Sequence, residues 1–323
     1  MRASAPRMNF SPAPLLRPST ALLALATLLA AGCASTRGSK PGDDDKAPKE
    51  PIADLVEATN KPAPIGQLLA QLDLSIQRWN ELLISGTTRE DREKARKLEL
   101  WIQGEAHRRR DELVEQLETG APQNRTVAAM ALGLTREVEV QSPLLAALED
   151  PEQAVVSNAL LGLGLLGRAD TPLARICALL RTHSDPSLRS NAALCLAQLT
   201  GAGAKDDCAL ESARLGLLDS EPTVRSHSAL VLGNLLDKTA VDSLVDHLAD
   251  PVPLVAAASA KALGHIGRAV PTERGRTARG LVTALDGSKG IVKEEVRKNL
   301  VLLAGIDYGK ESKEWLEWAA RLP

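Results

Sequence analysis

Apolar residues recur from residue 65 onward with the spacing of α-helices. In residues 65–83 they fall at i, i+3, i+4 and i+7 intervals, which predicts a helix with one buried face. A second helix is expected to begin near Thr88, because Thr88 and Asp91 form an acidic variant of a capping box, and its apolar stripe continues to about residue 118. Residues 65–118 are therefore predicted to form an N-terminal helical cap region. Two tryptophans on these stripes are expected to pack together, with a ligand-facing role as the alternative: Trp79 and Trp101.

A short motif, usually Leu-Gly, recurs between residues 104 and 307, and the segments around it align. A further apolar segment precedes each aligned helix, and in four of the units an acidic residue followed by Pro separates the two, as at Asp150-Pro151 and Asp250-Pro251. The residue before Pro is pushed out of the α region, and Pro fits the first helical turn, so each unit is predicted to be a helical hairpin. The aligned pairs are Leu132-Gly133, Leu163-Gly164, Leu196-Ala197, Leu232-Gly233, Leu263-Gly264 and Ala304-Gly305.

The turn from Leu218 to Arg225, followed by Ala229 and Leu232-Gly233, resembles a HEAT repeat, specifically the short HEAT-like repeats shared with phycobilin lyases. This resemblance implies an all-α fold, an α-solenoid of about six HEAT-like helical hairpins over residues 104–307 with an N-terminal helical cap. The pattern is not uniform, since Val156 and Ala256 replace the arginine of the motif, Ala197 replaces its glycine, and the turn of the last repeat, Asp286-Gly287, comes early.

The C-terminal segment, residues 308–323, looks like the terminal segment of many bacterial HEAT lipoproteins. Trp315 and Trp318 lie three residues apart and would share one face of a final helix. We expect this helix to cap the apolar edge of the last repeat, as the end of a solenoid requires.

Residues 1–32 have the form of a secretory signal, with a basic region, the uncharged apolar run Ala21–Ala31 and small residues before Cys33. As a helix, the run Ala21–Ala31 would span about 16 Å, roughly half of a bilayer's hydrocarbon core. The segment Ala30–Cys33 resembles the lipobox of bacterial lipoproteins, which implies lipidation of Cys33. The alternative is an ordinary secreted protein with a chance cysteine. Ala34 in place of Asp implies retention in the outer membrane, so the expected location is the cell envelope, anchored in the lipid bilayer and facing the periplasm.

Residues 33–64 are rich in Pro and charge and cannot bury enough apolar area to offset the entropy of ordering, so they are predicted to form a flexible tether. The whole chain is 44% apolar and 25% charged, which suits a folded protein with a sizeable core. Its formal net charge is −2, and removing a leader that holds three arginines makes it more negative. Nucleic acid is therefore not the expected partner.

Motifs that carry chemistry are scarce. Gly162–Gly167 matches G-x-G-x-x-G, but no predicted strand precedes it, so packing glycines are expected there. Cys195 is expected to be a small buried apolar residue, whereas a disulfide between Cys177 and Cys208 stays open. No metal or cofactor is expected. The histidines are predicted to be solvated, with a groove shared by His227 and His265 as the alternative; the five are His107, His183, His227, His247 and His265.

The second helix of each hairpin is predicted to line the inner curve of the solenoid and to present a strip of Ser, Asn and Leu side chains. We expect this strip to bind a partner protein or peptide, which makes the chain a non-catalytic scaffold. The alternative for its leucines is burial between neighbouring repeats. The alternatives for function are a bilin-lyase-like enzyme and a self-associating structural envelope protein. The predicted binding residues are Ser157, Asn158, Leu161, Ser190, Asn191, Leu194, Ser226, His227 and Leu230.

Overall fold

Residues 63–323, the part of the chain that the computed structural model describes, fold into stacked helical hairpins without a strand. The predicted leader, Cys33 and most of the predicted tether lie outside the described residues. The six hairpins are α4 (Arg110–Thr119) with α5 (Pro122–Thr135), α6 (Gln141–Ala146) with α7 (Gln153–Leu166), α8 (Ala174–Thr182) with α9 (Pro186–Gly201), α10 (Asp207–Gly216) with α11 (Pro222–Asn234), α12 (Val241–Asp246) with α13 (Pro253–Ala269), and α14 (Arg274–Gly287) with α15 (Gly290–Ala304).

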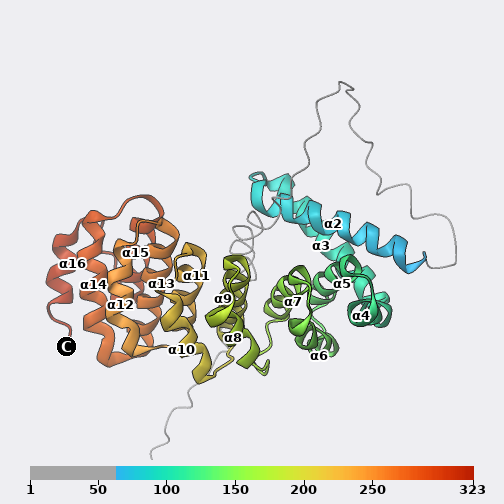
Figure 1. The fold of residues 1–323 in the computed structure, drawn as a ribbon. Helices are drawn as coiled ribbons and strands as arrows, with labels where there is room; N and C mark the ends of the chain where they lie inside the picture. The colour runs from blue at the N-terminus through green and yellow to red at the C-terminus, as the bar shows by residue number, and fades with distance from the viewer. Residues whose placement is uncertain (1–62) are drawn as a thin grey trace, which may run out of the picture.

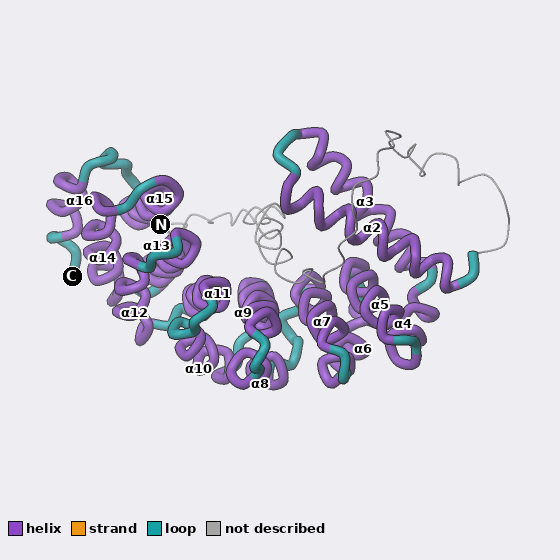
Figure 2. The backbone as a smooth tube through the Cα atoms, turned by 45° about the horizontal axis from the view of Figure 1, so that its top comes forward, coloured by secondary structure: helices purple, strands orange, loops and turns teal. Residues whose placement is uncertain are grey.

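The hairpins stack into an arc with two rows of helices (Figures 1 and 2). The second helix of each hairpin forms the inner row, which runs α5, α7, α9, α11, α13, α15, and each of these helices packs against the next. The first helices form the outer row, in which α6 and α12 are short and continue into the 3-10 turns Ala147–Glu149 and His247–Ala249. The predicted all-α solenoid is therefore confirmed. Further 3-10 turns lie at Val138–Val140, Lys238–Ala240 and Pro271–Glu273.

Two helices precede the first hairpin, α2 (Ile65–Ser85) and α3 (Arg89–Arg108). Thr88 caps α3 in a reciprocal capping box with Asp91, as its sequence predicts. The expectation that this helix runs on to residue 118 is wrong, because α3 ends at Arg108 and a new helix, α4, begins at Arg110. The break lets α3 pack on α2 while α4 turns to pair with α5. Trp79 is fully buried and Trp101 packs half-buried against the same core.

Small residues set how closely the inner helices approach. A Cβ atom on Gly133 of α5 would lie 2.2 Å from the Cα atom of Gly162 on α7. Gly164 lies in the interior of α7, where a Cβ atom would meet the side chain of Gln198 on α9. The G-x-G-x-x-G match is thus a helix interior in which glycines permit close packing.

The C-terminal helix α16 (Ser312–Ala319) packs against α14 and extends the outer row. Trp315 is buried, donates from its indole Nε1 to the Gly309 carbonyl at 3.0 Å and packs edge-on to Tyr308 with 5.0 Å between ring centroids. α16 thus packs on the first helix of the last hairpin, in the outer row. The end of the inner row is less well covered, because three apolar side chains on or beside α15 stay exposed: Ile291, Leu302 and Ile306.

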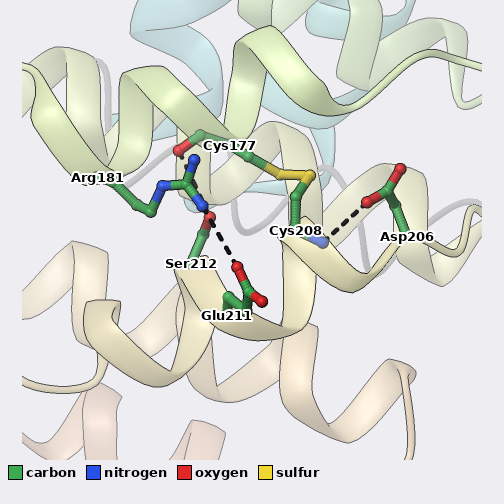
Figure 3. The surroundings of a disulfide bond; sticks show 6 residues. All are labelled: Cys177, Arg181, Asp206, Cys208, Glu211 and Ser212. Atoms are coloured by element: carbon green, nitrogen blue, oxygen red, sulfur yellow. Dashed lines mark hydrogen bonds and ion pairs between the residues drawn. A yellow bond between two sulfur atoms is a disulfide. The ribbon is translucent and has the colours of Figure 1, made fainter.

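A disulfide between Cys177 and Cys208 joins α8 to α10, the outer helices of two successive hairpins (Figure 3). The two cysteines are 31 residues apart, and a cross-link that closes a loop of this length stabilises a fold by roughly 3 to 4 kcal/mol in the chain-entropy model. The pairing that the sequence leaves open is thus formed. Cys195 is a buried free thiol on α9, as predicted, and burial raises its pKa far above the ordinary range.

Candidate interaction site

The strip of Ser, Asn and Leu side chains does not face outward. Leu161 is 2% exposed and Leu194 is 1% exposed, so the predicted outward orientation is wrong for both leucines. Burial also contradicts it for Ser190, Asn191, Ser226 and His227. The other three residues are half-buried: Ser157, Asn158 and Leu230.

The strip instead lies in the seam between consecutive inner helices, where its polar groups bond across repeats. Asn158 on α7 donates to the Thr126 carbonyl of α5 at 2.8 Å, and Asn191 on α9 donates to Ser157 Oγ of α7 at 2.5 Å. Ser190 continues the series by donating to Thr223 Oγ1 at 2.7 Å. Small residues bring the inner helices so close that positions expected in solvent serve inter-repeat packing, which favours the alternative of burial.

His227 departs most clearly from its predicted solvated position. It is 3% exposed in the seam, and its Nδ1 atom has no hydrogen-bond partner among residues 63–323. Burial lowers the pKa of His227 from 6.5 to about 4, because the charged imidazolium loses its hydration. The side chain is therefore neutral in the folded protein at pH 7.

We expect the neutral state of His227 to make the fold acid-sensitive. The unfolded chain takes up the proton near pH 6.5 and the folded chain only near pH 4, so stability is full above pH 6.5 and falls as the pH drops through that window. The expected loss between pH 7.5 and pH 5 is about 2 kcal/mol. Urea unfolding at both pH values should show a smaller loss in His227→Asn, which carries the residue found at the matching position of α9, but not in His107→Gln. An equal loss in wild type and His227→Asn would contradict this assignment.

A groove of ≈ 370 Å³ crosses the carboxyl ends of three inner helices. It spans α9, α11 and α13, so it crosses three successive hairpins. We call it the carboxyl-end groove. Its lining residues are Thr200, Gly201, Gly233, Asn234, Leu236, His265, Arg268 and Ala269.

Side chains of α11 and α13 give this groove its chemistry. Asn234 is fixed in place, because its amide donates to the Ala197 carbonyl at 2.9 Å and to Thr200 Oγ1 at 3.2 Å. His265 and Arg268 follow Lys261 at i+4 and i+7 on α13, which places the three basic side chains on one face of that helix. The pKa of His265 is lowered, first by burial and then by repulsion from Lys261. Of the two histidines that could share a groove by sequence, only His265 lines this one, since His227 is buried in the seam. The sequence analysis missed the basic column, although its spacing is visible in the sequence.

Most arginines of the repeat turns have a structural task. Arg225 on α11 donates bidentately to Asp250, from Nε at 2.9 Å and from Nη2 at 3.1 Å, and its Nη1 donates to the Asp219 carbonyl at 2.9 Å. Each such clamp ties the turn of one hairpin to the turn of the next. The other clamps pair Arg125 with Asp150 and Arg189 with Asp219. Repeats with Val156 or Ala256 lack the arginine, so the positions of the clamps follow the motif.

Among residues 63–323, no three His, Cys, Asp or Glu side chains group in a way that could hold a metal ion. Over the same residues, no helix combines the length and the apolar character needed to cross a bilayer.

The paired helices, the two rows and the turn clamps define an α-solenoid built from helical repeats. A family model described as HEAT repeats matches residues 110–197, 142–213 and 211–301, which together cover more than half of the chain. This protein therefore belongs to the HEAT-repeat family. No curated protein matches the chain.

Solved structures of low identity share parts of this architecture. An engineered protein is 18% identical with a TM-score of 0.46, covering 60% of this chain and 96% of its own. A HEAT-like repeats protein of the archaeon Thermococcus onnurineus is 15% identical with a TM-score of 0.45, over 76% of this chain and 99% of its own. The CpcE and CpcF complex of phycocyanin lyase from Nostoc sp. is 17% identical with a TM-score of 0.43, over 84% of this chain and 100% of that one. At these scores, none carries an activity or a partner over to this chain.

Proposed function

We propose that this chain is a non-catalytic protein–protein interaction scaffold, anchored in the outer membrane through Cys33 and facing the periplasm. The observation that carries the binding part is the carboxyl-end groove, which crosses three successive hairpins. A rigid row of stacked helices supports such a groove, because each repeat packs on its neighbours and Arg–Asp clamps tie three of the successive pairs together. An extended partner segment fits a site that runs from repeat to repeat.

The anchoring part rests on the sequence of the leader. Its apolar run is too short to span a bilayer, and the small residues before Cys33 match a lipoprotein cleavage site. A single acyl chain gives only marginal membrane binding, so multiple acylation of the N-terminal cysteine would be needed for stable attachment.

Replacing Cys33 by Ser is expected to remove the anchor. The wild-type protein should sediment with outer membranes after cell fractionation and dissolve only in detergent, whereas Cys33→Ser should no longer mature and should lose incorporated labelled fatty acid. Cys195→Ala serves as the matched control, because Cys195 is a buried free thiol in the solenoid and its loss leaves the leader intact. Unchanged fractionation and labelling of Cys33→Ser would defeat the anchor.

The scaffold role is tested by site-specific photo-crosslinking in intact cells. A photoreactive residue is placed at Leu236 or Ala269 in the groove, and at Leu100 or Leu218 elsewhere on the surface, all on the full-length chain. The proposal expects adducts with a different protein from the groove positions. Adducts only with a second copy of the chain would favour the self-associating role instead.

That second role has one observation in its favour, the exposed apolar residues Ile291, Leu302 and Ile306 at the open end of the inner row. An apolar patch at a solenoid end can pair with another copy. Sedimentation equilibrium over a range of concentrations distinguishes the self-associating role from the scaffold role. The double variant Leu302→Glu with Ile306→Glu should abolish self-association and leave binding in the groove intact.

A further inference from the structure

The basic column on α13 forms no ion pair within residues 63–323, although Glu295 on α15 acts on His265 through space. Neither Lys261, His265 nor Arg268 has a hydrogen-bonded or ion-paired partner among residues 63–323. The arginines of the repeat turns differ, because Arg189 and Arg225 are each bonded bidentately to an aspartate. The column therefore leaves its charge available to a ligand.

The surroundings of His265 make this region more electropositive. Lys261 and Arg268 on its own helix and Lys298 on the neighbouring α15 all lower its pKa, whereas Glu295 on α15 raises it. Glu295 is itself bonded to Lys298 and to the Asn299 amide, so it is engaged on α15. An anion placed against the column relieves this repulsion.

The same groove also offers hydrogen-bond acceptors. The carboxyl ends of α9, α11 and α13 meet there. Most last-turn carbonyls of α9 and α11 already accept backbone N–H groups, whereas those of Gly201, Asn234 and Arg268 accept no bond from residues 63–323. These carbonyls and the helix dipoles place partial negative charge beside the basic column. A ligand must therefore supply negative groups for α13 and N–H donors for the helix ends.

A peptide with carboxylate side chains supplies both, whereas a phosphodiester backbone has no donor to give. Along α13, Lys261 and Arg268 are separated by a rise of about 10 Å, which equals about three residues of extended chain. Acidic residues two or three positions apart would bring successive carboxylates opposite the column. Asn234 also lines the groove, and because its amide N–H groups are bonded to Ala197 and Thr200, its Oδ1 is left to accept a bond from a peptide N–H.

We infer that the carboxyl-end groove binds an extended acidic segment of a partner protein, with its carboxylates against His265 and Arg268 in the groove and against Lys261, which continues the basic column along α13 beyond the groove lining. This inference rests on the proposed scaffold function and adds the chemical class of the partner segment. The groove itself, the charge column and the helix-end acceptors are the three observations that carry it.

The test measures binding of a fluorescent twelve-residue peptide of alternating Glu and Gly to the full-length protein by anisotropy at low salt. Binding is expected for wild type, and Lys261→Glu with Arg268→Glu should weaken it at least tenfold. Lys97→Glu with Lys313→Glu is the matched control, because it makes the same charge change at exposed lysines on α3 and α16 and should leave affinity unchanged. Circular dichroism and thermal unfolding verify that both double variants fold.

Acidity gives a second readout. Carboxylates next to His265 favour its charged form, so affinity should rise as the pH falls from 7.5 to 5.5 in wild type and less so in His265→Gln. The peptide with Gln in place of Glu should not bind. Equal affinity of wild type and the Lys261 and Arg268 variant overturns the inference, as does a lack of peptide binding by wild type.

Two further probes separate this ligand from other anions, namely a twelve-nucleotide single-stranded DNA and vesicles of phosphatidylglycerol. Binding of either one, lost in the Lys261 and Arg268 variant, without peptide binding would assign the column to that anion and refute the acidic peptide. If a partner protein is still crosslinked in cells when Lys261 and Arg268 are replaced, the scaffold function is supported and the groove assignment is refuted. If the peptide binds in vitro but no adduct with another protein forms in cells, the groove assignment is supported and the proposed scaffold function is refuted.

Discussion

Replacing Asp250 by Ala is expected to destabilise the solenoid by about 3 to 5 kcal/mol, the usual cost of leaving one partner of a buried ion pair alone. Asp250 is 6% exposed and Arg225 is 14% exposed at the side chain, so Arg225 cannot regain full hydration after the change. The same carboxylate accepts a bond from the Val252 N–H at 2.9 Å at the start of the next inner helix. The variant therefore loses both the clamp and the turn, which urea unfolding monitored by circular dichroism would measure.

Asp242→Ala is the matched control. Asp242 also pairs with an arginine, Arg276, but its side chain is 75% exposed, so the loss should stay below about 1 kcal/mol. Similar losses in both variants would contradict the assignment of the clamp as a buried, stabilising pair.

The clamp also predicts a pH dependence. Burial opposes ionisation of Asp250, but the Arg225 guanidinium and the Val252 N–H outweigh it, so the pKa of Asp250 is lowered. A carboxyl group with a lowered pKa stabilises the fold above its unfolded value near 3.9 and loses that contribution as the pH falls. Below about pH 4, the difference in stability between wild type and Asp250→Ala should therefore shrink. A constant difference down to pH 2 would count against this reading.

The sequence predicts the hairpins well because their signals are local. Proline after an acidic residue ends one helix and starts the next within a few positions, and a glycine or alanine marks each close approach. The sequence predicts only one partner of each clamp. The motif shows the position of Arg225, but its aspartate lies 25 residues away in the next turn. The disulfide stays open at this level, since spacing does not fix the distance between α8 and α10.

The sequence predicts the candidate site less well than the hairpins. Periodicity alone predicts that Leu161 and Leu194 point outward. Whether such side chains are exposed to solvent or buried between helices depends on how closely the inner helices approach each other. The groove draws its walls from residues of three hairpins, so no single stretch of sequence displays it. The spacing of the basic column at i, i+4 and i+7 is visible in the sequence. An ordinary solvated helix face has the same spacing, and only the structure shows that these charges form no ion pair within residues 63–323.

Replacing Gly133 by Ala is expected to destabilise the fold by about 3 kcal/mol, although alanine is the better helix former. The added Cβ atom would lie 2.2 Å from the Gly162 Cα atom, and this neighbour is backbone, so no side-chain rotation relieves the contact. α5 and α7 must move apart, which opens the packing of the first two hairpins. Hydrogen exchange should show lost protection in both helices before the rest of the solenoid.

Gly66→Ala provides the matched control for this change. Gly66 lies in α2, and a Cβ atom there meets nothing within 4 Å, so the substitution should stabilise the helix by roughly 0.5 to 1 kcal/mol. The opposite signs of the two Gly-to-Ala changes separate helix propensity from helix spacing. Two stabilising outcomes would mean that α5 and α7 have room to spare, and the close-packed inner row inferred from the recurring small residues would then be wrong.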